Sequence, residues 1–405
     1  MMQDISSALR LKLGALNVVD GSKTPFGATI AAFPRGEEEA AFCIARAREA
    51  GLRVVCAGGG AYVDSLAPLP PASLLLSSHR MTRIVEHQPE NLVMTAEAGV
   101  TLATLQDALR RHRQFLPINV PDPDTATLAG IVSAAATGSW RAAYGPVRDW
   151  VLEVRGIDGM ARDVRGGARV VKNVAGYDIP KLYTGSRGTL AFITQVTFKV
   201  RPMPEQVTRL LFSAATWEAL HARLAALAAS EIRPTIVEVV RADIRDPAER
   251  PTAVITLEGS AETVQWQVVS CSEVLRGEGA MIGRVDYAPQ PPRGGDVEVT
   301  VRVIPSTIWE TLARVAESGW RGSAAYCPVE GRISLRCTAY PDTIEQIEAI
   351  RAYVEPQGGG VTIERMPRAW AGVVSPFGAP RPDAPLAQAI KAALDPDNVF
   401  PTLPK

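Results

Sequence analysis

Three segments rich in glycine and other small residues are the parts of this sequence best suited to hold a chemically active ligand. They are Gly58-Gly59-Gly60, the run AGIVSAAATG over residues 129–138, and GYDIPKLYTGSRG over residues 176–188. Glycine tolerates positive φ and leaves space for a ligand to approach the backbone. All three segments lie in the first half of the 405-residue chain. Together they predict a long ligand with phosphate groups, held mostly by backbone.

Each of the first two segments also has a purely structural interpretation. The triple glycine follows a strand-like run, Arg53–Cys56, but Tyr62, Val63 and several prolines come next instead of a helical pattern. This argues against Rossmann and Walker loops, in which a helix opens at the glycines. A turn of successive N–H groups can still bind a pyrophosphate, and a plain tight turn is the alternative. For residues 129–138 the alternative is a tightly packed core helix.

Histidine and cysteine usage limits the chemistry of the chain itself. The four histidines are His79, His87, His112 and His221, so the sequence after His221 has no imidazole to act as a general base near neutral pH. We expect surface or capping roles for His79 and His87, and a surface role for His221. The five cysteines form no Cys-x-x-Cys pair and predict buried thiols rather than a metal site or an iron–sulfur cluster. Iron–sulfur chemistry would have to come from a partner.

Composition excludes several classes of function. Lys plus Arg and Asp plus Glu both number 43, so no basic field is available for nucleic acid or anionic lipid. Aromatic residues make up 6% of the chain, so a basic and aromatic surface for single-stranded nucleic acid is not evident. No apolar run approaches the length that spans a bilayer. The N-terminal residues lack a signal-peptide pattern. We therefore expect a soluble, cytoplasmic protein.

Hydrophobic periodicity predicts the elements that would position these segments. In the first half, residues 91–98 alternate as a half-buried strand, and Thr101 opens a helix with Leu102, Leu105 and Leu109 on one face. Pro202 and Pro204 mark a domain boundary. Further predicted elements are a helix over 37–50 and strands over 53–56, 150–154 and 189–200.

The second half alternates strands and helices. This order predicts an α+β layer with helices on one face of an antiparallel sheet. The predicted strands are 210–214, 235–240, 252–259, 297–303 and 332–337, and the predicted helices are 217–229, 262–275, 306–316 and 341–354.

The order of the motifs resembles a known family. The glycine loop, EAGVTLATLQDAL, a proline loop, TLAGIVSAAATG, Tyr144-Gly145 and GTLAFITQVTFKVRPMPE follow one another as in the FAD-binding half of the vanillyl-alcohol oxidase and p-cresol methylhydroxylase-like flavoproteins. Within it, VVKNVAGYDIPKLYTGSRGTL and the closing AIKAALDPDNVFP resemble the FAD-binding, E-type subunits of glycolate oxidase. The likeness covers residues 1–204 well and about the last 40 residues moderately.

The resemblance implies a fold and a cofactor site. It implies an α+β protein with a two-subdomain FAD-binding domain of the p-cresol methylhydroxylase type over residues 1–204. An α+β cap domain with an antiparallel sheet follows over 205–405, and its C-terminal helix returns to the FAD domain. FAD would be non-covalent, since the glycine loop has no histidine. Lys172 would offset charge on reduced flavin. The implied FAD contacts are Ala57, Gly58, Gly59, Gly60, Ala61, Thr127, Gly130, Ser133, Thr137, Gly138, Tyr144, Gly145, Lys172, Asn173, Gly176, Tyr177, Asp178 and Ile193.

The same resemblance implies the function. The chain would be the FAD-binding subunit of a glycolate oxidase-type complex, which oxidises a 2-hydroxy acid (glycolate or D-lactate) to the 2-oxo acid. Its partners would be a second, catalytic flavin subunit and an iron–sulfur subunit that accepts the electrons. It would be cytoplasmic, or peripheral at the inner face of the membrane through that complex. No catalytic residue is assigned.

Two alternatives stay open. One is a self-sufficient FAD-dependent 2-hydroxy-acid dehydrogenase that uses a Tyr, Glu or Arg of the cap. The other is a scaffold subunit whose FAD site has decayed, because Ala61, Tyr62 and Arg187 depart from the family pattern.

Overall fold

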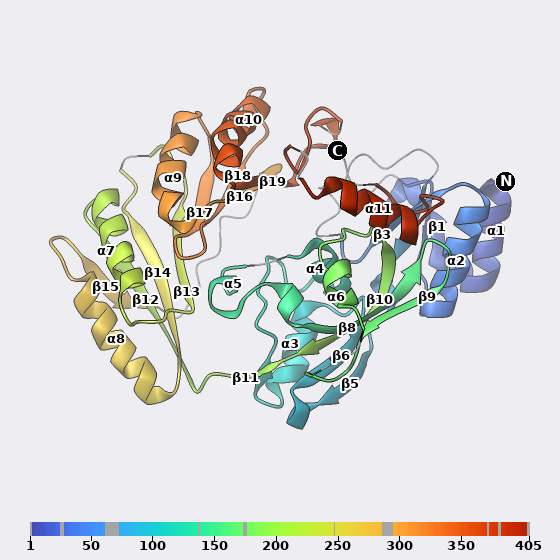
Figure 1. Cartoon of the computed structure of the whole chain (residues 1–405), viewed down its shortest axis with the longest axis horizontal. Helices are drawn as coiled ribbons and strands as arrows, with labels where there is room; N and C mark the ends of the chain where they lie inside the picture. The colour runs from blue at the N-terminus through green and yellow to red at the C-terminus, as the bar shows by residue number, and fades with distance from the viewer. Residues whose placement is uncertain are drawn as a thin grey trace. The chain divides into compact units, whose positions relative to one another are not determined.

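The chain divides into two compact units. The computed structural model describes residues 2–24, 28–60, 73–136, 138–172, 176–246, 248–285, 295–370, 372–379 and 382–402. Unit 1 comprises residues 1–138, 146–203 and 380–405, and unit 2 comprises residues 139–145 and 204–379 (Figure 1). Residues 139–145 therefore group with unit 2, although the predicted first domain runs without interruption over 1–204.

The first sheet of unit 1 carries the glycine loop at its edge. Its strand order is β1 (Val18–Asp20), β2 (Ile30–Ala32), β4 (Ser73–Ser77) and β3 (Arg53–Ala57), with β2, β4 and β3 parallel. α1 (Met2–Leu13) precedes this sheet, and α2 (Glu37–Glu49) connects β2 to β3. α2 begins with three glutamates and has Arg46 and Arg48 in its last turn, which suits the helix dipole. Because β3 ends at Ala57, Gly58 follows directly at the sheet edge.

The second sheet of unit 1 is antiparallel. Its order is β5 (Ile84–Gln88), β6 (Val93–Glu97), β10 (Ala191–Lys199), β8 (Val151–Asp158) and β9 (Asp163–Gly167). All five residues of β6 are buried, so the prediction of a half-buried strand is wrong. The polar residues can be buried because each has a partner. Thr95 Oγ1 lies 2.9 Å from Thr197 Oγ1, and Glu97 Oε1 accepts from Arg83 Nη2 at 2.7 Å.

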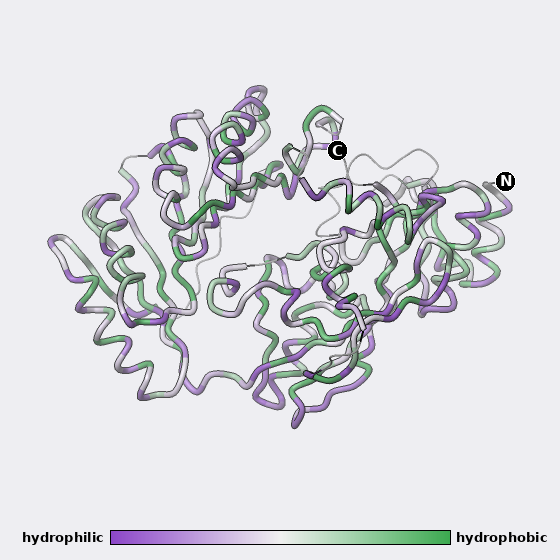
Figure 2. Tube along the Cα trace, in the orientation of Figure 1, coloured by the Kyte–Doolittle hydropathy of each residue, from purple (hydrophilic) through white to green (hydrophobic). Residues whose placement is uncertain are grey.

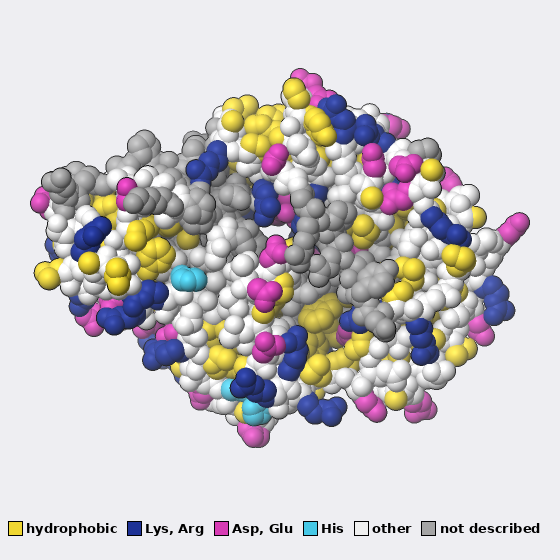
Figure 3. Space-filling model, turned by 180° about the vertical axis from the view of Figure 1, so that it is seen from behind, with side chains coloured by type: hydrophobic (Ala, Val, Ile, Leu, Met, Phe, Trp, Pro, Cys, Tyr) yellow, Lys and Arg dark blue, Asp and Glu magenta, His cyan; other side chains and the backbone are white. Residues whose placement is uncertain are grey.

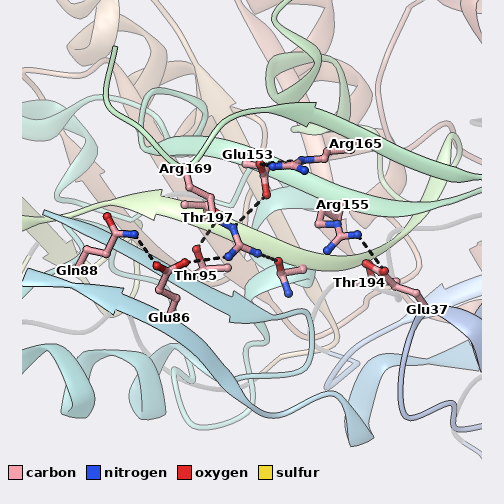
Figure 4. A network of polar contacts seen from close by, with 11 residues as sticks. Glu37, Glu86, Gln88, Thr95, Glu153, Arg155, Arg165, Arg169, Thr194 and Thr197 are labelled. Atoms are coloured by element: carbon pink, nitrogen blue, oxygen red, sulfur yellow. Dashed lines mark hydrogen bonds and ion pairs between the residues drawn. The ribbon is translucent and has the colours of Figure 1, made fainter. Parts of the chain in front are cut away.

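A polar network links the strands of this second sheet (Figure 4). Arg169 donates to Glu86 Oε2 at 2.8 Å, to Gln195 Oε1 at 2.7 Å and to Glu153 Oε1 at 3.4 Å, and these three residues lie on β5, β10 and β8. Arg165 on β9 donates to Glu153 Oε2 at 2.8 Å. The buried Glu153 carboxylate therefore has two guanidinium partners, which offsets its desolvation.

Short elements complete unit 1. α3 (Leu102–Arg110) is capped by Thr101, whose Oγ1 accepts from Thr104 N, and it buries Leu102, Leu105 and Leu109 as predicted. α4 (Leu128–Ala134), α6 (Ile179–Tyr183) and α11 (Ala384–Leu394) are the other helices, and β7 (Gln114–Phe115) pairs with β11 (Arg201–Pro202). The 3-10 helices of the described chain are Ala15–Asn17, Gly21–Lys23, Ser78–Arg80, Pro89–Asn91, Val147–Asp149, Pro305–Thr307, Glu355–Gln357 and Arg368–Trp370.

Unit 2 is one antiparallel sheet covered by helices on one face (Figure 1). The strand order is β15 (Met281–Arg284), β12 (Gln206–Ser213), β14 (Thr252–Gly259), β13 (Ile236–Arg241), β17 (Ser323–Cys327), β18 (Arg332–Cys337), β16 (Val297–Arg302) and β19 (Gly360–Arg365). The helices on that face are α7 (Trp217–Ala229), α8 (Ala261–Leu275), α9 (Ile308–Glu317) and α10 (Thr343–Val354), and the short α5 (Arg141–Tyr144) also belongs to this unit.

The core of unit 2 lies between this sheet and α7 to α10. Phe212, Ile255 and Leu335 from the sheet pack in one cluster with Leu224 and Ile347 from the helices. In Figure 2 these helices alternate between green and purple along their length, as amphipathic helices do. The predicted α+β class, with helices on one face of an antiparallel sheet, is confirmed.

Charged side chains of both signs are mixed on the surface, as the equal numbers of basic and acidic residues in the sequence predict. Figure 3 shows positive and negative side chains interspersed over one face of the molecule. Within the described residues, no helix combines the length and the apolar character that a bilayer crossing requires.

Candidate cofactor site

A pocket in unit 1 is bounded by five segments. These are the end of β3 with the glycine loop, Ser78 directly after β4, α4 with its capping residue, the turn over residues 185–188, and the start of β10. The empty space is about 630 Å³, including its opening to solvent. Backbone and small side chains form most of its wall. The lining residues are Cys56, Ala57, Gly58, Gly59, Gly60, Ser78, Thr127, Ala129, Gly130, Ser133, Ala134, Arg187, Gly188, Ala191, Phe192 and Ile193.

The glycine loop is glycine-rich because the chain packs tightly against itself there. A Cβ on Gly58 would overlap Thr127 Oγ1, and a Cβ on Gly59 would overlap the carbonyl oxygen of Thr125. Gly60 has a φ of 85°, in the left-handed region that favours glycine. The loop backbone consequently lies against residues 125–127 and forms part of the pocket wall.

α4 shows why residues 129–138 are small. Its large side chains, Leu128, Ile131 and Val132, are buried in the unit, whereas Gly130 and Ser133 line the pocket. Thr127 caps the helix, with Oγ1 accepting from Gly130 N at 3.3 Å. The two interpretations of this segment therefore hold together: it is a packed core helix, and its small residues form a ligand-sized surface.

The Gly-Ser-Arg-Gly turn is bonded to the end of α4. Gly185 N donates to Val132 O at 2.9 Å, and Arg187 N donates to Ser133 O at 2.8 Å. Gly188 has a φ of 71°, and a Cβ there would lie 3.1 Å from Cys56 Cβ. Arg187 and Gly188 are thereby placed in the pocket wall, beside β3.

Eight of the predicted FAD contacts lie together in this pocket: Ala57, Gly58, Gly59, Gly60, Thr127, Gly130, Ser133 and Ile193. Other predicted contacts are not among its lining residues. Gly138 is packed against Asn119, and Tyr144 and Gly145 belong to unit 2, where Tyr144 OH donates to Glu258 Oε2 at 2.6 Å. Ala61, Thr137 and Asn173 lie outside the described residues.

The signature around Lys172 is exposed where it is described. Lys172, Gly176, Tyr177 and Asp178 all have exposed side chains or backbone, and Tyr177 is 91% exposed. Lys181 Nζ pairs with Asp178 Oδ2 at 2.7 Å. The proximity of these residues to flavin stays a prediction.

Ser78 and Cys56 are among the pocket residues that the sequence reasoning did not predict. Ser78 is 1% exposed, and its hydroxyl has no hydrogen-bond partner among the described residues. Buried hydroxyls are normally hydrogen-bonded, so this one fits a polar ligand. The signal for it was weak: two serines directly after the apolar run LLL. Burial raises the pKa of Cys56 to about 12, so its side chain is a neutral thiol and not a nucleophile.

Unit 2 has a buried ionic cluster on the sheet face opposite α7 to α10. Val237 and Val239 of β13 face the helical core, so Glu238 between them points to the other face. Glu238 and Arg332 are 4% and 6% exposed, and Arg332 donates to Glu238 at 3.5 Å and to Ser334 Oγ at 2.8 Å. Burial raises the pKa of Glu238. Glu330 adds ion pairs to Arg141, Arg302 and Arg332 at 3.0, 3.2 and 3.2 Å.

His221 is not the surface residue that the sequence predicts. Its ring stacks on Trp309 with centroids 3.6 Å apart, because α7 and α9 cover the same sheet face. Burial lowers the pKa of His221 to about 4. His79 is exposed as expected, while His87 is half-buried and lies 2.9 Å from Gln114 Oε1.

The comparisons with known proteins agree with this pocket. Residues 28–165 match the family described as an FAD binding domain. Over 138 residues the chain is 40% identical to glycolate oxidase subunit GlcE of Escherichia coli, which covers 34% of this chain and 39% of that protein. The chain thus carries an FAD binding domain and is similar to FAD-linked glycolate oxidase subunits.

Other similarities extend over more of the chain. It is 33% identical over 185 residues to D-lactate dehydrogenase of Archaeoglobus fulgidus, covering 46% of the chain and 41% of that protein. Both sequence matches thus span about two-fifths of the relative's length. The crystal structure of p-cresol methylhydroxylase with substrate bound is similar in fold over 98% of this chain and 95% of that one, with a TM-score of 0.76 and 15% identity.

FAD is the cofactor that the matched domain binds, and the unit 1 pocket fits it. The wall of backbone and small side chains leaves room for a long ligand. The loop over Gly58 to Gly60 can offer N–H groups to a pyrophosphate, and the Ser78 hydroxyl still has a free hydrogen-bonding capacity among the described residues. The expectation of FAD is confirmed. Its non-covalent attachment stays a prediction.

Proposed function

We propose that this chain is the FAD-binding subunit of a glycolate oxidase-type complex that oxidises a 2-hydroxy acid to the 2-oxo acid. The observation that carries the proposal is the unit 1 pocket, and it is supported by the 40% identity over 138 residues to the glycolate oxidase subunit of Escherichia coli. We infer glycolate as the substrate of the complex, with D-lactate as the alternative, and a cytoplasmic location.

The residues of the pocket would bind and orient the cofactor. When bound, FAD supplies a hydride acceptor for the α-carbon of the hydroxy acid. Thr127 and Ser133 offer hydroxyls beside the backbone of the glycine loop. Phe192 and Ile193, both nearly fully buried, supply an apolar wall that excludes water.

A subunit role is supported by the absence of an available imidazole base in unit 2. By sequence, His221 is the one histidine of residues 139–145 and 204–379. With its pKa near 4 and its ring stacked on Trp309, it is a weak and poorly accessible base. We therefore infer that a second flavin subunit contributes the substrate base. An iron–sulfur subunit would accept the electrons, because the five cysteines of this chain are free and separate.

The first test is the visible absorbance of the purified chain under anaerobic conditions, before and after glycolate or D-lactate is added. The proposal expects flavin bands that stay unchanged in the isolated chain and bleach when the partner subunits are present. Bleaching in the isolated chain would instead show a self-sufficient dehydrogenase. A colourless chain that still binds its partners would show a scaffold with a decayed site.

One observation favours the self-sufficient dehydrogenase as the second candidate. Glu238 has a raised pKa, which makes its carboxylate a better base, and it is paired with a guanidinium that could bind a carboxylate. On this alternative, Glu238→Gln abolishes bleaching by the hydroxy acid while bound flavin is retained. Glu310→Gln, at an exposed position of α9, is the control.

A further inference from the structure

We propose that Lys391 is a positioning residue of the FAD pocket: its ammonium, paired with Asp395, joins the C-terminal segment to two walls of the pocket. The inference rests on the binding of FAD by unit 1 and does not depend on the substrate. Both residues and all the contacts that carry the argument lie within unit 1.

The Lys391 ammonium is buried, and each of its three protons has an acceptor. The residue is 8% exposed, on α11, and Nζ donates to Thr189 O at 2.8 Å and to Phe400 O at 3.1 Å. The third partner is the Asp395 carboxylate. Three acceptors match the three protons of an ammonium group, so its orientation is fixed.

Asp395 is equally constrained. It is 0% exposed, Oδ1 accepts from Val399 N at 2.8 Å, and Oδ2 accepts from Phe400 N at 2.9 Å. A Cβ on Gly159 would overlap Oδ1, so the turn between β8 and β9 has a glycine where the carboxylate needs space. The pair is therefore enclosed by chain segments far apart in the sequence.

The bond from Lys391 to Thr189 O connects the pair to the turn that carries Arg187 and Gly188. Thr189 directly follows these two pocket residues, and its N and Oγ1 donate to Ser186 O at 3.0 and 2.7 Å. By accepting from Lys391, the carbonyl of Thr189 fixes the far end of the turn. The near end is fixed by the bonds from Gly185 and Arg187 to α4.

Val399, whose N–H donates to Asp395, connects the pair to the strand that leads into the glycine loop. Val54 N on β3 donates to Val399 O at 2.7 Å. β3 is an edge strand of its sheet, so this bond occupies a backbone position that the sheet leaves open. Residues 391–400 thus hold the strand entering the glycine loop and the turn opposite it.

Stability alone does not explain such a pair. Replacing a buried ion pair by neutral groups of similar size is often neutral for stability, whereas removing one partner leaves an uncompensated charge and is strongly destabilising. Removing both charges together therefore separates the two roles. If the pair only stabilises the fold, the double variant keeps the FAD affinity of the wild type. If the pair positions the pocket, the double variant binds FAD more weakly.

The experiment compares the wild type, Lys391→Met, Asp395→Asn and the double variant by two measurements. FAD affinity is measured by titrating the apo chain with FAD, and the melting temperature of the apo chain is measured separately. We expect both single variants to lose affinity and melting temperature. In the double variant the melting temperature returns close to that of the wild type, while FAD binding stays about tenfold weaker or more because the bond to Thr189 is missing.

Lys12→Met is the matched control, since Lys12 forms an exposed pair with Glu38 away from the pocket. It should leave FAD affinity unchanged. The proposal is overturned if the double variant binds FAD as the wild type does, or if affinity follows melting temperature through all variants. Because no substrate is used, a failure of the proposed reaction would not affect this result.

Discussion

Two buried serines of unit 1 differ in one respect that bears on FAD binding. Ser73 and Ser78 are 0% and 1% exposed, and within the described residues neither hydroxyl has a hydrogen-bond partner. Ser78 lines the pocket, and Ser73 does not. The difference makes Ser73 a natural control for the role of Ser78.

Ser78→Ala should weaken FAD binding about tenfold, because a buried hydroxyl that bonds the cofactor contributes about 0.5–1.5 kcal/mol or more. Ser73→Ala should leave the affinity unchanged. Fluorescence titration of the apo chains with FAD measures both. Equal affinities for the two variants would mean that Ser78 does not contact the cofactor.

The buried imidazole of His221 predicts a pH dependence of unfolding. Its pKa is about 4 in the folded chain and about 6.5 when unfolded, so between these values the unfolded state binds more protons. The free energy of unfolding should therefore fall as the pH is lowered from about 6.5 to about 4. The urea midpoint of the wild type should drop more over this range than that of His221→Phe. A parallel drop in both chains would contradict the assignment.

At the scale of elements, the connection from β3 into the glycine loop depends on close packing against residues 125–127. Gly59→Ala introduces a Cβ that would overlap the carbonyl of Thr125, which is backbone and cannot move aside cheaply. We expect the purified variant to retain little or no flavin. Gly36→Ala is the control, since nothing lies within 4 Å of its Cβ position and its φ of −173° suits any residue. Flavin absorbance per chain after purification measures the outcome, and full occupancy in Gly59→Ala would refute it.

The boundaries of elements were predictable where a local pattern specifies them. α7 spans Trp217–Ala229 and β14 spans Thr252–Gly259, the same bounds that periodicity predicts. β17, over Ser323–Cys327, was missed because it is buried on both faces and shows no alternation between polar and apolar residues. β6 has an alternating pattern, yet its polar residues are buried, since Thr197 on β10 and Arg83, just before β5, bond them.

At the scale of the whole molecule, the two units should respond differently to FAD. The pocket is formed by unit 1, so bound FAD stabilises unit 1 by mass action. Calorimetry of the apo chain should show two transitions, and FAD in excess should raise the melting temperature of one of them. A single transition, or an equal shift of both, would show that the units unfold together. The domain boundaries predicted at residue 204 stay a proposal until this is measured.

The sequence by itself determined the class of fold, the cofactor and the main segments of the cofactor site. Helical and strand periodicity depends on residues close in the chain, and small residues at Gly58, Gly130 and Ser133 already indicate a close approach of backbone. Only the tertiary structure decided which other groups join them. Lys391 reaches Thr189 from 202 residues away, and Ser78 gains its role from a pocket to which five separate segments contribute. No local pattern carries such information, because contacts between distant segments are fixed by packing.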